Sequence, residues 1–131
     1  MKSTVQPKKA MQHIQKVLGS IDFRTINPLP GEFIGLYRLP SGEGCIEFVR
    51  LETGSYQPHI HDNIDAHLTI LSGSGQIILN GKAHSFAAGS TYEVPAGASH
   101  GFLIENTTIL LSVQDKPILN EETNEADIRL A

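Results

Sequence analysis

The 131-residue sequence has one cysteine, Cys45, no tryptophan and no long basic run. A single cysteine excludes an internal disulfide framework. Phosphate binding needs clustered lysine and arginine, so a chain without such clusters and with a net charge of −4 is not expected to bind nucleic acid. No apolar stretch approaches the about 20 residues of a membrane helix, and the opening MKSTVQPKK has no apolar signal core. These absences predict a cytoplasmic protein with no membrane partner.

The composition is that of an ordinary globular domain, with 40% hydrophobic and 18% charged residues. Residues 7–18 predict a short helix, because their apolar side chains form one stripe, Pro7 suits the first turn and Gly19 suits the end. We therefore divide the chain into an N-terminal helix and extension (1–30), a β domain (31–114) and an acidic C-terminal tail or edge strand (115–131).

The β domain is predicted from short alternating segments that lie between turns rich in proline and glycine. CIEFVRLE (45–52) alternates cleanly, and Asn80-Gly81 is a strong signal for a two-residue hairpin. Many short strands separated by such turns indicate a β-sandwich or barrel. The expected strands are residues 33–39, 45–52, 67–72, 76–80, 82–86, 90–94, 101–104 and 107–113, with 127–131 as an optional edge strand.

The stretch QPHIHDNIDAH (57–67) raises the question of a metal site. Residues i and i+2 of a strand share a face, so His59 and His61 point two imidazoles, the commonest metal-ligand group, in one direction. The alternative interpretation of this pair is a polar strand edge with two solvated histidines. His100 follows the Pro95-Ala96-Gly97 turn at the start of a strand, and consecutive hairpins would bring it over the pair. We therefore expect His59, His61 and His100 to converge.

The same stretches resemble the two motifs of the cupins, which are small jelly-roll barrels. The first motif, G-x5-H-x-H-x3-4-E-x6-G, is similar to Gly54 through Gly73, with one residue fewer after the first glycine. The second, G-x5-P-x-G-x2-H-x3-N, matches from Gly89 through His100, and Ile104 replaces its final asparagine. The resemblance implies an all-β jelly-roll (cupin) barrel, here with a short N-terminal helix, and a homodimer.

The first motif breaks at its glutamate, which supplies the remaining protein ligand in the family. Ala66 occupies that position, although its neighbours Asp65 and His67 carry ligand atoms. A regular strand would turn Ala66 inward and His67 outward, leaving three histidines, as in some cupin dioxygenases. A bulge near residue 66 would turn His67 inward as a fourth ligand. The candidate ligands are His59, His61, His67 and His100, with Asp65 or no fourth protein ligand as the alternatives.

The histidine set implies one divalent metal ion, with Fe, Zn, Mn, Ni and Cu not distinguished. The resemblance implies a small-molecule substrate and a metal-dependent enzyme of dioxygenase type. The alternative is a non-catalytic cupin that binds or senses a small ligand, because fold does not determine function. The sequence contains no G-x-S-x-G motif and no P-loop that would indicate another chemistry.

Overall fold

The computed structural model describes residues 16, 24–25, 32–38, 44–120, 123 and 125–131. The helix predicted for residues 7–18 lies outside these residues, apart from Lys16. No helix in the described part of the chain has the length and apolar character needed to cross a membrane. The strands are β1 (Arg24–Thr25), β2 (Glu32–Arg38), β3 (Cys45–Leu51), β4 (Gly54–Ile60), β5 (Ala66–Leu79), β6 (Lys82–Phe86), β7 (Thr91–Val94), β8 (His100–Gln114), β9 (Leu119–Asn120), β10 (Glu125–Ala126) and β11 (Arg129–Leu130).

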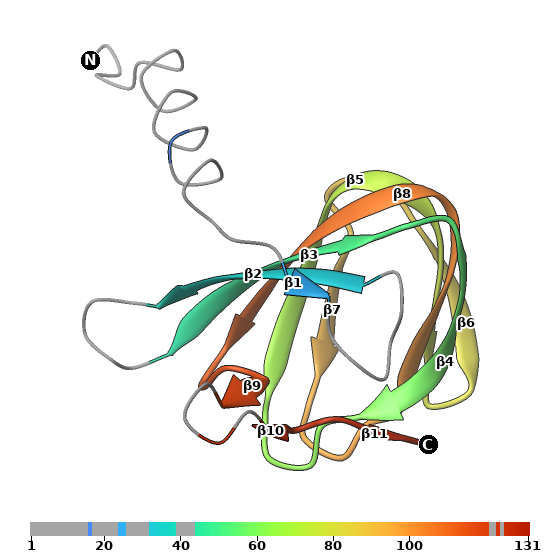
Figure 1. Cartoon of the computed structure of the whole chain (residues 1–131). Helices are drawn as coiled ribbons and strands as arrows, with labels where there is room; N and C mark the ends of the chain where they lie inside the picture. The colour runs from blue at the N-terminus through green and yellow to red at the C-terminus, as the bar shows by residue number, and fades with distance from the viewer. Residues whose placement is uncertain (1–15, 17–23, 26–31, 39–43, 121–122, 124) are drawn as a thin grey trace, which may run out of the picture.

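Two long antiparallel strands, β5 and β8, form the centre of a strongly curled sheet (Figure 1). The other edge of β8 pairs with β4 near its start and with β3 near its end. The other edge of β5 pairs with β7 and then with β6. Strand β2 extends the sheet beyond β3, and β11 extends it beyond β4. The predicted all-β jelly-roll barrel is confirmed, and its inner surface gathers side chains from β2, β3, β4, β5 and β8.

Strand β5 unites two segments that the sequence predicts as separate strands, 67–72 and 76–80. The pairing of β5 with β8 shifts register between Ile70 and Gly75 but does not break. A Cβ at Gly73 would lie 2.3 Å from Thr108 Oγ1, and one at Gly75 would lie 2.2 Å from the carbonyl oxygen of Leu103. Glycine is therefore required for close approach, and the sheet continues through bulges.

The hairpin predicted at Asn80-Gly81 is confirmed. Asn80 and Gly81 have φ angles of 46° and 83°, and Leu79 pairs with Lys82 on either side of them. Two consecutive residues with positive φ match the twist of the flanking strands, which is why this dipeptide is favoured in such turns. The segments 101–104 and 107–113 likewise form one strand, β8.

Candidate metal centre

His59 faces inward because β4 contains a bulge. Tyr56 pairs with Phe102 and His59 pairs with His100, with a register shift between the two pairs. Tyr56 and His59 are three positions apart, yet both are buried, which a regular strand would not allow. Gly101 accommodates the bulge, since a Cβ at that position would lie 2.8 Å from the carbonyl oxygen of Tyr56. The glycine after His100 thus lets the β4 bulge turn His59 toward its partner.

His61 follows the last residue of β4 and lies against the turn of the second motif. Its carbonyl oxygen accepts a hydrogen bond from the amide of Gly97, 2.9 Å away. Gly97 has φ of 85°, in the left-handed region, and the amide of Ala98 closes the turn onto the carbonyl oxygen of Pro95 at 3.0 Å. One hydrogen bond therefore fixes the two motifs to each other beside the histidines.

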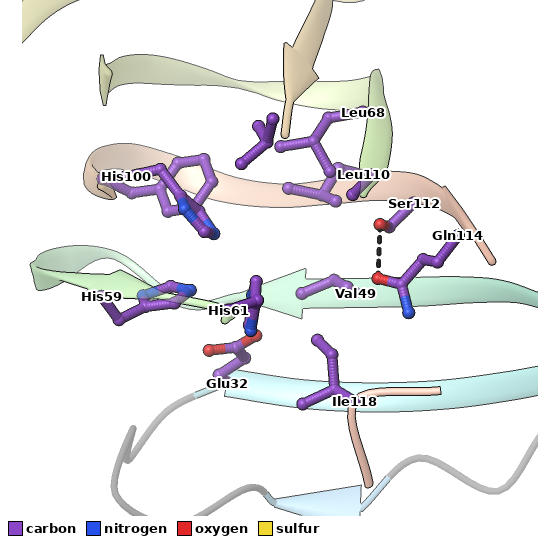
Figure 2. A pocket seen from close by; sticks show the side chains of 13 residues that line it. Glu32, Val49, His59, His61, Leu68, His100, Leu110, Ser112, Gln114 and Ile118 are labelled. Carbon is purple, nitrogen blue, oxygen red and sulfur yellow. Dashed lines mark hydrogen bonds between the residues drawn. The ribbon is translucent and has the colours of Figure 1, made fainter. Parts of the chain in front are cut away.

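The three imidazoles of His59, His61 and His100 converge on one point inside the barrel (Figure 2). Each offers a ring nitrogen, and these nitrogens all lie within 4.8 Å of one another. The ring centroid of His100 is 4.1 Å from that of His59 and 5.0 Å from that of His61. No other group of three histidine, cysteine or carboxylate side chains in the described residues meets in this way. The predicted convergence is therefore present in the structure.

Burial keeps these imidazoles neutral. Desolvation, followed by the neighbouring imidazoles of His100 and His61, lowers the pKa of His59 to about 2. Desolvation and then His61 lower the pKa of His100 to about 4. The pKa of His61 is also lowered, chiefly by desolvation, although the backbone and charge of Asp127 oppose the shift. Neutral imidazoles keep the lone pair that metal binding requires.

The hydrogen bonds of the three rings fit a metal at their centre. Nδ1 of His100 lies 3.2 Å from the carbonyl oxygen of Ala98, and Nδ1 of His61 contacts the carbonyl oxygen of Asp127. If each Nδ1–H donates to its carbonyl, each Nε2 keeps a free lone pair. Nδ1 of His59 is buried without a hydrogen-bond partner among the described residues. Three imidazole nitrogens form a donor set suited to a divalent transition metal.

His67 does not join the other three histidines. It is exposed on the outer face of β5, where its Nδ1 contacts the carboxylate of Glu93. The register from Ala66 to Ile70 is regular, so Ala66 and Leu68 face inward and His67 faces outward. The bulges of β5 begin beyond Ile70, too far along the strand to turn His67 around. Of the four candidate ligands, the structure brings together His59, His61 and His100 and leaves His67 apart from them.

Asp65 also lies outside the cluster and has a structural role. Its Oδ1 accepts a hydrogen bond from the amide of Ala96 at 2.8 Å. Its own amide lies 3.3 Å from Oδ1 of Asp115. Asp65 thereby secures the turn that precedes His100, and its carboxylate is engaged there.

Glu32, which no sequence motif indicated, lines the same cavity as the histidines with its carboxyl group (Figure 2). Glu32 begins β2 and pairs with Leu51. Its side chain is 7% exposed, and burial, reinforced by the charge of Glu47, raises its pKa to about 8. Glu32 and the buried Ile34 are two positions apart in β2 and therefore share its inner face. Extending the predicted strand 33–39 by one residue would have included Glu32.

The cavity beside the histidines is small and mainly apolar, with a volume of about 30 Å³. At its far end, Ser112 donates a hydrogen bond to Gln114 at 2.7 Å, and Gln114 donates to the carbonyl oxygen of Lys116 at 3.0 Å. These polar groups bond to each other and to the backbone, whereas the three histidines gather at the opposite end of the cavity (Figure 2). The lining residues are Glu32, Val49, His59, His61, Ala66, Leu68, Val94, His100, Phe102, Leu110, Ser112, Gln114 and Ile118.

Comparison with protein families places this site in a known fold. A family model described as a cupin domain matches residues 47–113. The chain belongs to the cupin family, and the matched residues carry all three clustered histidines. Glu32 and the C-terminal strands lie outside the match. A comparison with curated protein sequences gives no match.

Solved structures share the fold at low sequence identity. KdgF from Halomonas sp. is 18% identical with a TM-score of 0.61, over 71% of this chain and 85% of that one. Streptomyces PAC13 with uridine is 18% identical with a TM-score of 0.65, over 86% of each chain. The salicylate 1,2-dioxygenase of Pseudoaminobacter salicylatoxidans is 19% identical with a TM-score of 0.61, over 81% of this chain but 30% of that one. These likenesses concern the fold alone.

Proposed function

We propose that the protein is a metal-dependent cupin enzyme that acts on a small molecule. His59, His61 and His100 hold one divalent metal ion, and the substrate binds at the positions that they leave open. The observation that carries this proposal is the meeting of three buried, neutral imidazoles whose ring nitrogens lie within 4.8 Å of one another. A buried polar cluster is retained at a cost in stability, which a bound metal offsets.

Dioxygenase chemistry is the activity that the ligand set favours. Iron held by three histidines resembles the site of some cupin dioxygenases and would supply oxygen chemistry at its open positions. The chain itself contributes the apolar wall of Val49, Leu68 and Leu110, which keeps bulk water from the reacting groups. The cavity of about 30 Å³ holds roughly two water molecules, so only a small part of a substrate reaches the histidines.

Glu32 favours a second candidate, a metal-assisted proton transfer such as an isomerisation or elimination. Its carboxyl group faces the cavity that the histidines line, and its raised pKa of about 8 lies near neutral pH. A carboxyl group with such a pKa can both donate and accept a proton under physiological conditions. In this case Glu32 would exchange a proton with the substrate, while the histidines and their metal hold it in place.

Metal analysis of protein purified without added metal tests the shared part of both candidates. Wild-type protein is expected to contain close to one equivalent of a divalent transition metal per chain. His59→Ala and His100→Ala are expected to lose it, whereas His84→Ala, which changes an exposed histidine of β6, keeps it. Folding of each variant is checked by circular dichroism. Equal metal content in all four proteins would contradict the proposal.

Activity assays separate the candidates. Oxygen consumption with a panel of thiols, β-diketones and catechols is expected for the dioxygenase. Solvent-deuterium incorporation into small hydroxy-carbonyl compounds, lost in Glu32→Gln, is expected for the proton-transfer enzyme. A protein that retains its metal and binds a compound without converting it would instead be a non-catalytic cupin that binds or senses a ligand.

A further inference from the structure

The C-terminal segment, residues 125–131, lies beside the end of β4 that carries His59. In β11, Arg129 pairs with Ile60 and Leu130 pairs with His59. The amide of Ala131 then bonds to the carbonyl oxygen of Pro58 at 3.0 Å. The segment therefore follows β4 along the bulge that aims His59 into the cavity, although it lies outside the matched cupin domain.

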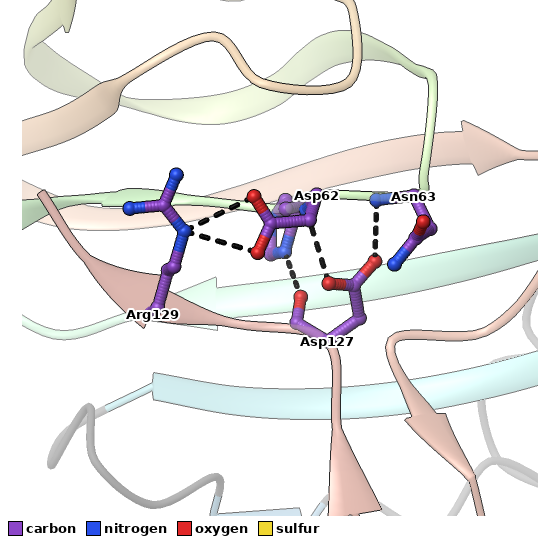
Figure 3. Close-up of polar contacts among 5 residues, drawn as sticks. Asp62, Asn63, Asp127 and Arg129 are labelled. Atoms are coloured by element: carbon purple, nitrogen blue, oxygen red, sulfur yellow. Dashed lines mark hydrogen bonds and ion pairs between the residues drawn. The ribbon is translucent and has the colours of Figure 1, made fainter.

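Asp127 makes the closest link between this segment and the cluster (Figure 3). Its carbonyl oxygen contacts Nδ1 of His61. A carbonyl oxygen only accepts, so this contact requires the proton of a neutral His61 on Nδ1 and directs the lone pair of Nε2 toward the other two imidazoles. The C-terminal segment thus selects the tautomer of His61 that can bind a metal.

The side chain of Asp127 holds that carbonyl in place. Its two carboxylate oxygens accept hydrogen bonds from the amides of Asp62 at 3.0 Å and Asn63 at 2.9 Å. These two residues directly follow His61, so the carbonyl oxygen and the carboxylate of Asp127 both bind to residues 61–63. Nε of Arg129 lies 3.0 Å from each carboxylate oxygen of Asp62 and adds an exposed ion pair.

The segment is anchored to the barrel as well as to the turn. The amide of Asp127 bonds to the carbonyl oxygen of Ile118 at 2.9 Å. Ala126 and Ile128, on either side of Asp127, are partly buried and pack against the core. Removal of the Asp127 side chain should therefore loosen the hydrogen bond between its carbonyl oxygen and His61. The apolar packing of Ala126 and Ile128 should still keep the segment near its position.

We propose that Asp127 is a positioning residue of the metal centre, and that docking of residues 125–131 and metal binding stabilise each other. This inference rests on the proposed function, since it assumes that His61 binds a metal. Each event favours the same arrangement of His61, so the docked segment raises metal affinity. By thermodynamic linkage, the bound metal strengthens docking by the same factor.

Cobalt titration of the full-length protein tests the first half of the proposal. Binding of Co²⁺ alone is followed by its visible absorption bands. Asp127→Ala keeps the carbonyl that contacts His61 but removes the two hydrogen bonds that hold it in place. It is expected to weaken binding by about 10-fold, the low end of the effect of losing an outer contact of a ligating histidine. Asp127→Asn, which keeps one acceptor oxygen, is expected to fall between that variant and the wild type.

Glu125→Ala is the matched control, because it removes an exposed carboxylate from the same segment. It is expected to bind Co²⁺ as the wild type does. Wild-type affinity in Asp127→Ala, or an equal loss in Glu125→Ala, would overturn the inference while leaving the metal site standing. Failure of the wild type to bind Co²⁺ would instead overturn the proposed function and the inference with it.

Amide hydrogen exchange of the wild type tests the second half and needs no variant to fold. Saturating Zn²⁺ is expected to slow exchange at the amides of Asp127 and Ala131 by at least the factor by which Asp127→Ala weakens metal binding, because that variant removes only part of the docking contacts. The amide of Lys82, the first residue of β6, serves as the internal control. Unchanged exchange at Asp127 and Ala131 in Zn²⁺-bound protein would contradict the coupling.

Discussion

The two faces of strand β5 have different environments. One face forms part of the wall of the cavity that holds the three clustered histidines, and the other carries His67, which lies outside that cluster. Ala66 and Leu68 are each 6% exposed and line the cavity, whereas His67 between them is exposed and contacts Glu93. Proximity in sequence to His59 and His61 therefore says little about ligation. The face of the strand decides whether an imidazole is desolvated and neutral beside others or solvated beside a carboxylate.

Ala66→Glu should have the largest effect, because it places the family's glutamate on the inner face. A carboxyl group buried in a cavity of about 30 Å³ without a cation should destabilise the metal-free protein by about 3 kcal/mol. Saturating Zn²⁺ should restore part of this loss, since the carboxylate then has a counter-charge. Urea unfolding with and without Zn²⁺ measures both effects, and equal losses under the two conditions would contradict them.

The pH dependence of stability should separate the buried histidines from Glu32. The pKa of His100 is lowered to about 4, so below about 6.5 the unfolded chain takes up protons that the folded protein does not. Stability is therefore lost as pH falls from 6.5 toward 4. The pKa of Glu32 is raised to about 8, so its contribution is present below 4.5 and is lost as pH rises through 8.

Metal-free protein should therefore be most stable where these two opposing losses balance, on the acidic side of neutrality. Thermal unfolding of wild type and Glu32→Gln across pH 4 to 9 provides the test. Glu32→Gln should remove the decline between pH 6.5 and 8 and leave the acid-side decline. A wild-type decline that persists unchanged in Glu32→Gln would show that another group causes it.

Gly101→Ala should have a smaller effect, centred on the bulge that turns His59 inward. Its new methyl group would lie 2.8 Å from the carbonyl oxygen of Tyr56 and 2.9 Å from the nitrogen of Pro58, both of which belong to the backbone. We expect a loss of about 1–3 kcal/mol in the free energy of unfolding, together with weaker metal binding. Urea unfolding and Co²⁺ titration measure the two, and wild-type affinity would mean that the bulge is not required for ligation.

His67→Ala should have the smallest effect. The pair that His67 forms with Glu93 is exposed, with side-chain exposures of 45% and 77%, so its removal should change the free energy of unfolding by at most about 0.5 kcal/mol. Metal affinity should not change. A loss of metal from this variant would return His67 to the ligand set.

The sequence predicted the barrel and the inner histidines because both depend on short-range patterns. His59, His61 and His100 stand in motifs whose spacing reflects strand parity and one tight turn. Whether His67 faces inward or outward depends on where β5 bulges. The bulges in turn depend on contacts of Gly73 and Gly75 with residues far along the chain. Those contacts cannot be read from the alternation of β5 alone.

Glu32 and Asp127 escaped prediction for a related reason. Each reaches the site from a segment outside the motifs, and each depends on the pairing of strands distant in sequence. Asp127 lies in an acidic stretch whose composition describes only a tail or an edge strand, yet it contacts residues 61–63. The homodimer expected from the resemblance stays a prediction, which light scattering in solution tests.

X-ray absorption spectroscopy of the zinc-loaded protein tests the central claim most directly, because it counts the imidazoles bound to the metal. The account predicts three imidazole nitrogens at about 2.0–2.1 Å, with the remaining positions taken by light oxygen atoms. The same spectrum should be obtained from His67→Ala. Four imidazoles in the wild type and three in His67→Ala, or a zinc surrounded by oxygen atoms alone, would contradict a centre built from His59, His61 and His100.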